Sequence, residues 1–192
     1  MDEVIINAYD LSWPEVFAGE AWAIRQALGD VLAGVEHVGS TSIPGLASKP
    51  VIDIVVSVTS LAAARVPALE SLGYDCRGEN GIPGRLFFRK GLVEFRRTHY
   101  LHLVEAGHEQ WESMLLFRDY LRSHPGDARR YEELKRTLAG KFRDNRSAYT
   151  KGKADFVQVV LEKARNPCRE RQGLKVQSPA FRTGDSESAG AD

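Results

Sequence analysis

The chain has 192 residues, of which 43% are hydrophobic and 27% are charged, a composition typical of a globular protein with one sizeable core. Its formal net charge of zero argues against a nucleic-acid partner. No run approaches the roughly 20 apolar residues of a membrane span, and the N-terminus lacks the basic flank and apolar run of a secretory signal. We therefore expect a cytoplasmic protein with no membrane partner.

The predicted elements alternate between helix and strand in the first half of the chain and are helical in the second. A capping box from Ser12 to Glu15 begins the first helix, and Gly34 breaks the chain after it. The β-branched run 51–58 predicts a central strand that is covered on both faces. In chain order the sequence predicts helix 12–33, strands 35–38 and 51–58, helix 60–72 interrupted at Pro67, strands 86–90 and 97–104, and three helices between 107 and 164.

These elements predict one α/β (α+β) unit over residues 1–165. Residues 1–105 would form a mixed sheet of four or five strands flanked by helices, and residues 106–165 a C-terminal helical layer that closes a cleft. Residues 166–192 are rich in Pro, Ser, Gly and charge, so we expect a disordered tail there.

A hydroxyl-rich turn follows the first predicted strand, in the sequence HVGSTSIPGL at 37–46. Gly39, Ser40, Thr41 and Ser42 can direct backbone N–H groups and hydroxyls toward one point, which suits a phosphate oxygen. The same turn is more often an ordinary helix cap, so the motif is weak by itself.

Asp53 stands in the middle of the otherwise apolar strand 51–58. A carboxylate is costly to bury there without a partner. A metal ion, a basic side chain such as Lys49, or solvent at a cleft would each satisfy it, and an internal salt bridge is the structural alternative.

Four blocks of sequence together resemble the GrpB family, a branch of the nucleotidyltransferase superfamily. They are EHVGSTSIPGL at 36–46, KPVIDI at 49–54, RTHYLH at 97–102 and FRDYLR at 117–122, and the resemblance extends through Tyr131, Lys135, Tyr149 and Lys153 to cover about residues 7–165. The resemblance implies a nucleotidyltransferase-like fold. GrpB-like domains also occur fused to dephospho-coenzyme A kinase, which implies a context in coenzyme A metabolism.

In that superfamily a Gly-Ser turn receives the triphosphate, and two acids on the following strand hold two divalent metal ions. Gly39, Ser40 and Asp53 match this pattern. The second acid is replaced by Val55, which has no oxygen to bind a metal. The resemblance therefore implies a divalent cofactor, Mg²⁺ or Mn²⁺, at Asp53, but without the second carboxylate.

A histidine on the strand 97–104 is the other predicted catalytic and metal-binding residue. Alternation along the strand places His102 with Tyr100 on one face, and His99 with two leucines on the other, so we expect His102 at the cleft. An imidazole can bind Mn²⁺ or act as a general base, and a plain structural hydrogen bond is the alternative.

The second half of the chain is more basic than the first and could supply phosphate contacts. Tyr131 and Lys135, like Tyr149 and Lys153, lie four residues apart, so each pair presents a ring and an ammonium on one helix face. We expect Lys135 and Lys153, together with Lys49, to bind phosphate. Surface decoration or helix packing is the alternative.

These features predict metal-dependent transfer of a nucleoside monophosphate from a nucleoside triphosphate to an unidentified acceptor, with Asp53 and His102 as the catalytic residues. The alternative is a non-catalytic module that binds a nucleotide or another phospholigand and is linked to coenzyme A metabolism. A third interpretation is a protein-interaction adaptor with a vestigial cleft.

Overall fold

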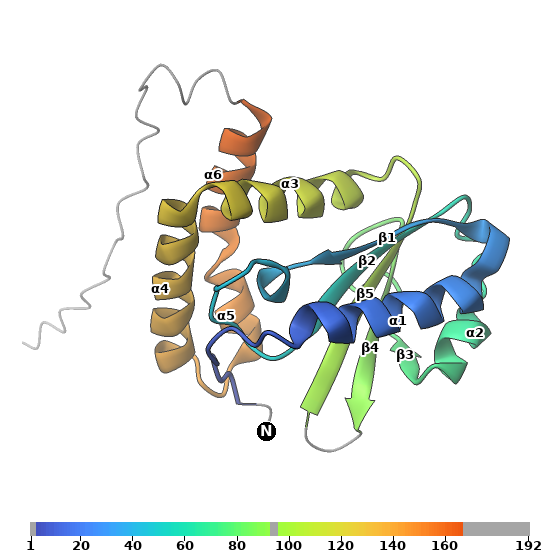
Figure 1. Cartoon of the computed structure of the whole chain (residues 1–192), viewed down its shortest axis with the longest axis horizontal. Helices are drawn as coiled ribbons and strands as arrows, with labels where there is room; N and C mark the ends of the chain where they lie inside the picture. Colours follow the sequence, from blue (N-terminus) through green and yellow to red (C-terminus); the bar gives the residue numbers. More distant parts are fainter. Residues whose placement is uncertain (1–2, 93–95, 167–192) are drawn as a thin grey trace, which may run out of the picture.

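A five-stranded mixed β-sheet forms the centre of the protein (Figure 1). The computed structural model describes residues 3–92 and 96–166, so the predicted tail 166–192 lies outside the described residues except for Asn166. The strands are β1 (Leu32–Val38), β2 (Ile52–Val58), β3 (Tyr74–Cys76), β4 (Arg85–Leu92) and β5 (Arg96–Glu105). They lie in the order β1-β2-β5-β4-β3, and only the β2–β5 pair among the described strands is parallel. The predicted mixed sheet is confirmed.

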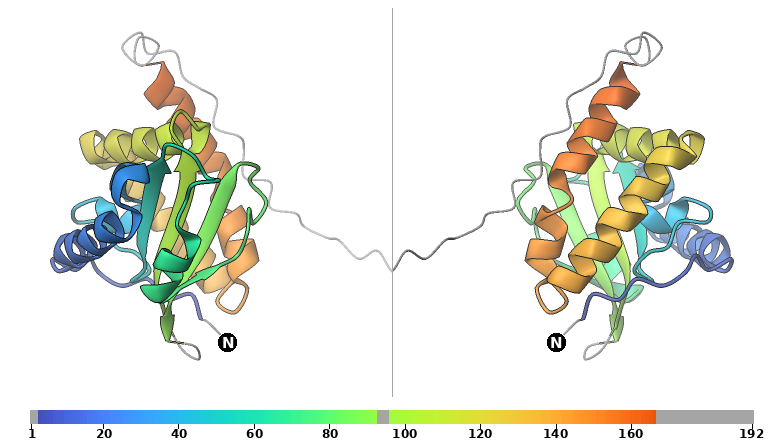
Figure 2. Two further views of the ribbon diagram at one scale, coloured as in Figure 1. Left: turned by 90° about the vertical axis from the view of Figure 1, so that its right-hand side faces the viewer. Right: turned by 90° about the vertical axis from the view of Figure 1, so that its left-hand side faces the viewer.

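Two helices, α1 (Trp13–Leu28) and α2 (Val66–Ser71), pack on one face of the sheet (Figure 2). Alternate residues of the central strands, such as Ile54 and Leu101, point to this face and are fully buried in the largest apolar cluster. The period-two alternation of strands leaves the intervening residues, Asp53 among them, on the opposite face.

The two ends of α1 differ from the prediction. Ser12 occupies the N-cap, but its side chain makes no capping hydrogen bond; its backbone N–H instead donates to Asp10 at 2.8 Å. The helix ends at Leu28 because Gly29 takes a φ of 57°. Gly34 lies inside β1, where a Cβ would come within 2.7 Å of the Trp111 ring. Gly34 is therefore needed because Trp111 of a later helix packs closely against β1, and not because a helix ends there.

The helices α3 (Glu109–Ser123), α4 (Pro125–Lys141), α5 (Arg146–Lys151) and α6 (Ala154–Arg165) form the layer on the other side. They number four where the sequence predicted three. Gly152 separates α5 from α6, and a Cβ there would lie 2.6 Å from Leu138 of α4, so the turn can approach α4 only with glycine. The buried Arg118 joins this layer to β1, donating to Glu36 at 2.7 Å and to the His37 carbonyl at 3.0 Å.

Two shorter elements also depart from the predicted boundaries. The helix predicted over 60–72 begins only at Val66, because Pro67 fits the first turn of a helix but not its interior. The strand β3 was not predicted, since its three residues are too few to show an alternating pattern.

The segment before α1 pairs with two distant parts of the chain. Asn7 exchanges backbone hydrogen bonds with Ser48, at 2.8 and 2.9 Å, in the loop that leads into β2. The Val4 N–H donates to the Arg143 carbonyl at 2.9 Å, between α4 and α5. The loop before β2 and the α4–α5 connection are thus fixed by one short segment.

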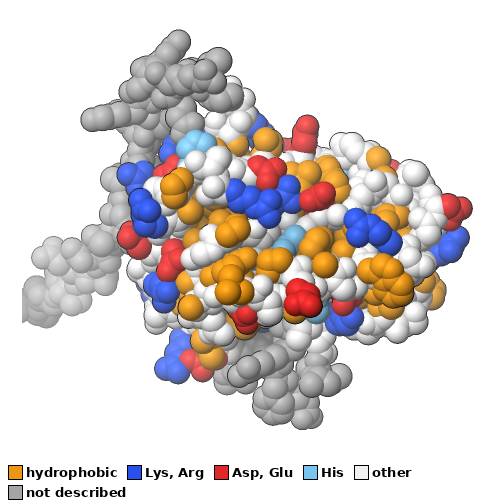
Figure 3. Space-filling model, viewed as in Figure 1, with side chains coloured by type: hydrophobic (Ala, Val, Ile, Leu, Met, Phe, Trp, Pro, Cys, Tyr) orange, Lys and Arg blue, Asp and Glu red, His pale blue; other side chains and the backbone are white. Residues whose placement is uncertain are grey.

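None of the helices in the described part of the chain is both long and apolar enough to cross a membrane. On the face seen in Figure 3, Lys and Arg side chains are intermixed with acidic and hydrophobic ones. This face therefore carries no single-sign surface of the kind that a general nucleic-acid coat requires.

Candidate functional site

A cavity of about 590 Å³ lies between the sheet face opposite α1 and the helical layer. The sheet contributes Asp53 of β2 and residues of β4 and β5, and α3, α4, α5 and the turn after α5 contribute the opposite wall. Its described lining residues are Val38, Gly39, Ser40, Ser48, Lys49, Val51, Asp53, Asn80, Arg85, Phe87, Arg89, Arg97, Tyr100, His102, Met114, Tyr131, Arg146, Tyr149, Thr150 and Lys153. The structure thus brings six of the nine residues predicted for the site to one cavity.

Asp53 and Gly39 meet at the end of β1. Val38 pairs with Asp53 across the antiparallel β1–β2 ladder, so the next residue, Gly39, lies directly beside the carboxylate. Gly39 has a φ of 69°, and a Cβ on it would lie 2.5 Å from Oδ2 of Asp53. Burial raises the pKa of the Asp53 carboxyl from 3.8 to about 6, although Lys49 and Lys153 act to lower it. Asp53 is therefore mostly ionised at pH 7.

The hydroxyl-rich turn forms a three-residue 3₁₀ helix, η2 (Ser40–Ser42), with only Gly39 and Ser40 at the cavity. The buried Thr41 hydroxyl donates to the Val51 carbonyl at 3.3 Å and accepts from Nε2 of His37 at 2.9 Å. The Ser42 hydroxyl donates to the Gly39 carbonyl at 2.7 Å. Both hydroxyls hold the turn itself, so the structure does not bring them to the cavity.

His102 lines the cavity as an acceptor for Arg85. The guanidinium Nη1 lies 3.3 Å from His102 Nδ1, and because arginine can only donate, Nδ1 must accept. Burial, and then the charge of Arg85, lower the pKa of His102 to about 3. The ring is therefore neutral with its proton on Nε2, which leaves no lone pair for a metal ion.

The described residues do not fit the two-metal centre of the superfamily. No group of three or more His, Cys, Asp or Glu within residues 3–92 and 96–166 could hold a metal ion. Val55, at the position of the missing acid, lies on the same face as Asp53 but is fully buried with Val38 and Val104, beneath Trp111 and neighbouring side chains of α3. A metal would find Asp53 as its single carboxylate ligand among the described lining residues.

Basic side chains dominate the cavity. Six Lys or Arg residues line it, against one acid, Asp53, among the described lining residues; they are Lys49, Arg85, Arg89, Arg97, Arg146 and Lys153. The ammonium groups of Lys49 and Lys153 lie 5.0 and 4.7 Å from the centroid of the same ring, Tyr149. Repulsion between like charges in a partly enclosed space favours an anionic ligand.

Lys135 is the predicted phosphate-binding lysine that the structure keeps away from this cavity. It is 1% exposed, and its ammonium donates to the Ala47 carbonyl and lies 4.9 Å from the Tyr131 ring centroid. The ring and ammonium pair that the i, i+4 spacing predicts does form. Through its bond to the Ala47 carbonyl, Lys135 supports the loop before Lys49.

Three cavity residues of β4 were missed by sequence reasoning, namely Arg85, Phe87 and Arg89. They alternate along the strand and so share one face, which is the signal that could have found them. Arg85 is itself fixed by the Glu79 and Asn80 carbonyls, at 2.9 and 2.8 Å from Nη2. The loop before β4 therefore orients a cation at the cavity.

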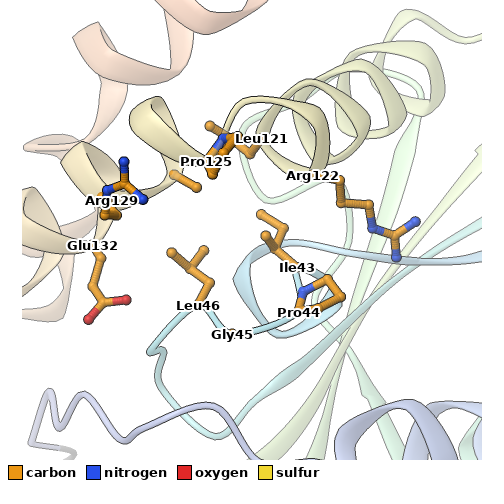
Figure 4. A pocket seen from close by; sticks show the side chains of 10 residues that line it. Ile43, Pro44, Gly45, Leu46, Leu121, Arg122, Pro125, Arg129 and Glu132 are labelled. Atoms are coloured by element: carbon orange, nitrogen blue, oxygen red, sulfur yellow. The ribbon is translucent and has the colours of Figure 1, made fainter.

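A second cavity of about 480 Å³ lies where the loop after η2 meets α3 and α4 (Figure 4). Ile43 and Leu46 line it, with Arg122 and Glu132 on opposite sides. Arg122 donates to the Ser42 carbonyl at 2.8 Å, and Glu132 accepts from the Ala47 N–H at 3.0 Å. Arg122 and Glu132 thus hold the loop backbone.

The sheet, its two helical layers and the basic cavity between them define an α+β protein. A family profile described as "GrpB protein" matches residues 3–163, and the chain therefore belongs to the GrpB family. It is 44% identical over 167 residues to the UPF0157 protein PA4798 of Pseudomonas aeruginosa, a match covering 85% of this chain and 68% of the relative.

Other members of the family give the same result. The match to the UPF0157 protein YqkA of Bacillus subtilis is 35% identical over 190 residues and covers 98% of this chain but 55% of YqkA, so the chain spans about half the length of that relative. The crystal structure of the conserved protein GrpB from Enterococcus faecalis has a TM-score of 0.77 at 36% identity, and covers 86% of this chain and 99% of that chain. The fold is therefore shared within the family.

Two more distant likenesses concern the predicted function. Cid1 in complex with the UTP analogue UMPNPP has a TM-score of 0.42 at 14% identity, covering 77% of this chain and 48% of that chain. The dephospho-CoA kinase of Mycobacterium leprae is 28% identical over 142 residues, which is 59% of this chain and 35% of the kinase. Both are too remote to assign an activity to this chain.

Proposed function

We propose that the basic cavity binds a phosphorylated small molecule, with a nucleotide as the first candidate. The observation that carries this proposal is the concentration of six Lys or Arg side chains against one acid in a cavity of about 590 Å³, within a chain of zero net charge. Because charges in a cleft with low-dielectric walls attract counter-ions strongly, a multiply charged phosphate group is the ligand that best matches this charge.

The walls of the cavity also suit a ring system. Phe87 and Tyr100 lie side by side on β4 and β5, with ring centroids 5.4 Å apart, and face the cavity from the sheet. A flat base could stack there while the phosphates meet Lys49, in the loop before β2, and Lys153, after α5. Aromatic rings beside basic side chains in one cavity support a nucleotide over inorganic phosphate.

The effect of removing the Asp53 charge differs between simple phosphate binding and metal-dependent nucleotidyl transfer. Without a metal ion, its carboxylate opposes an incoming phosphate, so its removal should strengthen binding. In a metal-dependent transferase the same carboxylate would be needed to hold the ion, so its removal should weaken binding. The close approach of Asp53 to Gly39, with Ser40 lining the same cavity, is the observation that favours transfer as the second candidate.

The test is a calorimetric titration of the full chain with ATP, with and without Mg²⁺, followed by dephospho-coenzyme A. We expect ATP to bind without metal. We expect Lys153→Gln to weaken binding on the order of tenfold, since one charged hydrogen bond is lost. Lys151→Gln, an exposed lysine outside the cavity, is the matched control and should change nothing.

The Asp53→Asn variant then decides between the two candidates. Tighter metal-free binding by this variant supports the phospholigand module. Binding that requires Mg²⁺ in the parent and is weakened or abolished in the variant supports metal-dependent transfer instead. If the parent binds neither compound at millimolar concentration, the proposal is wrong and the adaptor interpretation is favoured.

A further inference from the structure

Lys49 is held in place by its backbone neighbours. Ser48 pairs with Asn7, and the Lys49 carbonyl accepts from the Val51 N–H at 2.8 Å just before β2 begins. The side chain leaves this fixed backbone toward the cavity, which it lines together with Asp53 and Tyr149. A side chain anchored at its base presents its amine at a defined position.

The ammonium of Lys49 has unusual surroundings for a lysine. It lies 5.0 Å from the centroid of the Tyr149 ring, and in the described part of the chain it forms no ion pair with a carboxylate. The ammonium of Lys153 lies over the same ring, and the Arg146 guanidinium is close enough to repel it. Cationic neighbours and partial burial both favour the neutral amine.

Burial, followed by the charges of Lys153 and Arg146, lowers the pKa of Lys49 to about 7, while Asp53 opposes the shift. About half of the molecules would then carry a neutral amine at pH 7, whereas an ordinary lysine with a pKa of about 10.4 is almost wholly protonated. Lys135 has a similarly lowered pKa of about 7, but it is 1% exposed and its nitrogen is bound to the Ala47 carbonyl. Lys49 is thus the one of these two amines that a ligand can reach.

We propose that Lys49 is a nucleophilic amine that reversibly captures phosphorylated aldehydes in the cavity. The lone pair of Nζ attacks the carbonyl carbon, the C–N bond forms, and the carbonyl oxygen leaves as water, so that amine and aldehyde give an imine and water. The basic side chains of the cavity would hold the phosphate while the amine reacts. The phosphate part of this inference rests on the function proposed above; the nucleophilic amine does not.

The probe is pyridoxal 5′-phosphate, an aldehyde that carries a phosphate, compared with pyridoxal, which lacks it. The full chain is treated briefly with each probe at pH 7, the imine is reduced with borohydride, and the labelled lysine is identified by peptide mass spectrometry. We expect Lys49 to be labelled on the order of tenfold faster than the exposed Lys151, because its lowered pKa raises the share of reactive neutral amine at Lys49. Pyrophosphate should protect Lys49 and leave Lys151 unaffected.

Lys49→Arg keeps the positive charge but removes the nucleophile, so we expect this variant to lose the fast label. Lys151→Arg should keep it. Because the site is mapped in the parent chain, the result does not depend on how well the variants fold. Labelling of Lys49 at the rate of Lys151 would overturn the proposal. Equal rates with both probes at Lys49 would support the nucleophilic amine and overturn the phosphate site, so the two failures are distinguishable.

Discussion

Replacing Asp53 by Asn should stabilise the protein without its ligand, and only at neutral or alkaline pH. Asn keeps the shape of the side chain and its place beside Gly39, but removes the charge. Folding raises the pKa of the Asp53 carboxyl from 3.8 to about 6 because the ionised form is poorly solvated in the cavity. The folded state therefore holds the Asp53 proton more tightly than the unfolded state does.

The sign and size of the effect follow from this difference. Below about pH 3 both states are protonated and Asp53 costs nothing. As the pH rises through 3.8 toward about 6 the unfolded state ionises first, so the free energy of unfolding falls, and above about pH 6 the full cost remains. A shift of about two pKa units corresponds to about 3 kcal/mol. The variant should recover most of this at pH 8 and almost none at pH 4.

Urea denaturation of the parent and of Asp53→Asn at pH 4 and pH 8 would measure both differences. The expected result is a higher midpoint for the variant at pH 8, with little change at pH 4. A variant that is less stable than the parent at pH 8, or a difference that is the same at both values, would show that Asp53 is well satisfied in the unliganded protein. The reasoning from burial would then be refuted.

Three further substitutions test the packing around the cavity. Gly39→Ala should lower the free energy of unfolding by about 1–3 kcal/mol, because a Cβ would collide with Asp53 and the φ of 69° disfavours alanine. Thermal denaturation would measure the loss. An unchanged melting temperature would contradict the close contact of Gly39 with Asp53. Val55→Asp should destabilise the protein by about 3–5 kcal/mol, because it puts an unpaired charge beneath α3. A variant that folds and gains Mg²⁺ affinity would show instead that α3 moves aside. Arg118→Ala should destabilise the protein by about 3 kcal/mol, because it leaves the Glu36 carboxylate and the His37 carbonyl without this partner. Urea unfolding would measure the change. A difference under 1 kcal/mol would contradict the role of Arg118 in linking α3 to β1.

The position of Asp53 could be predicted from the sequence because a single strand decides it. A β-branched run predicts a central strand, and alternation assigns its residues to faces without knowledge of the rest of the fold. The same argument placed His102 and Tyr100 together and separated them from Leu101, as the structure has them. Features that depend on a single strand or helix can therefore be predicted from the sequence.

Features that depend on how two elements pack together could not be predicted from the sequence. Alternation puts Val55 on the face of Asp53, but only the packing of α3 closes the sheet above it. The hydroxyls of Thr41 and Ser42 were expected at the cavity, yet nearby backbone carbonyls accept from them. Lys135 likewise finds a carbonyl partner 88 positions away along the chain. The Lys135 partner is too distant in sequence to leave a local pattern, whereas the Ser42 hydroxyl has the local role, within its own turn, that the sequence also allowed.

The short segment before α1 has a consequence for any measurement of ligand affinity. Asn7 holds the strand-like stretch next to Lys49, and Val4 holds the connection next to α5, which carries Arg146 and Tyr149. The two walls that supply charge to the cavity are thus linked through a few residues near the N-terminus, and their spacing depends on that link. A truncation that removes Val4 and Asn7 would loosen the cavity from a distance, although neither residue lines it.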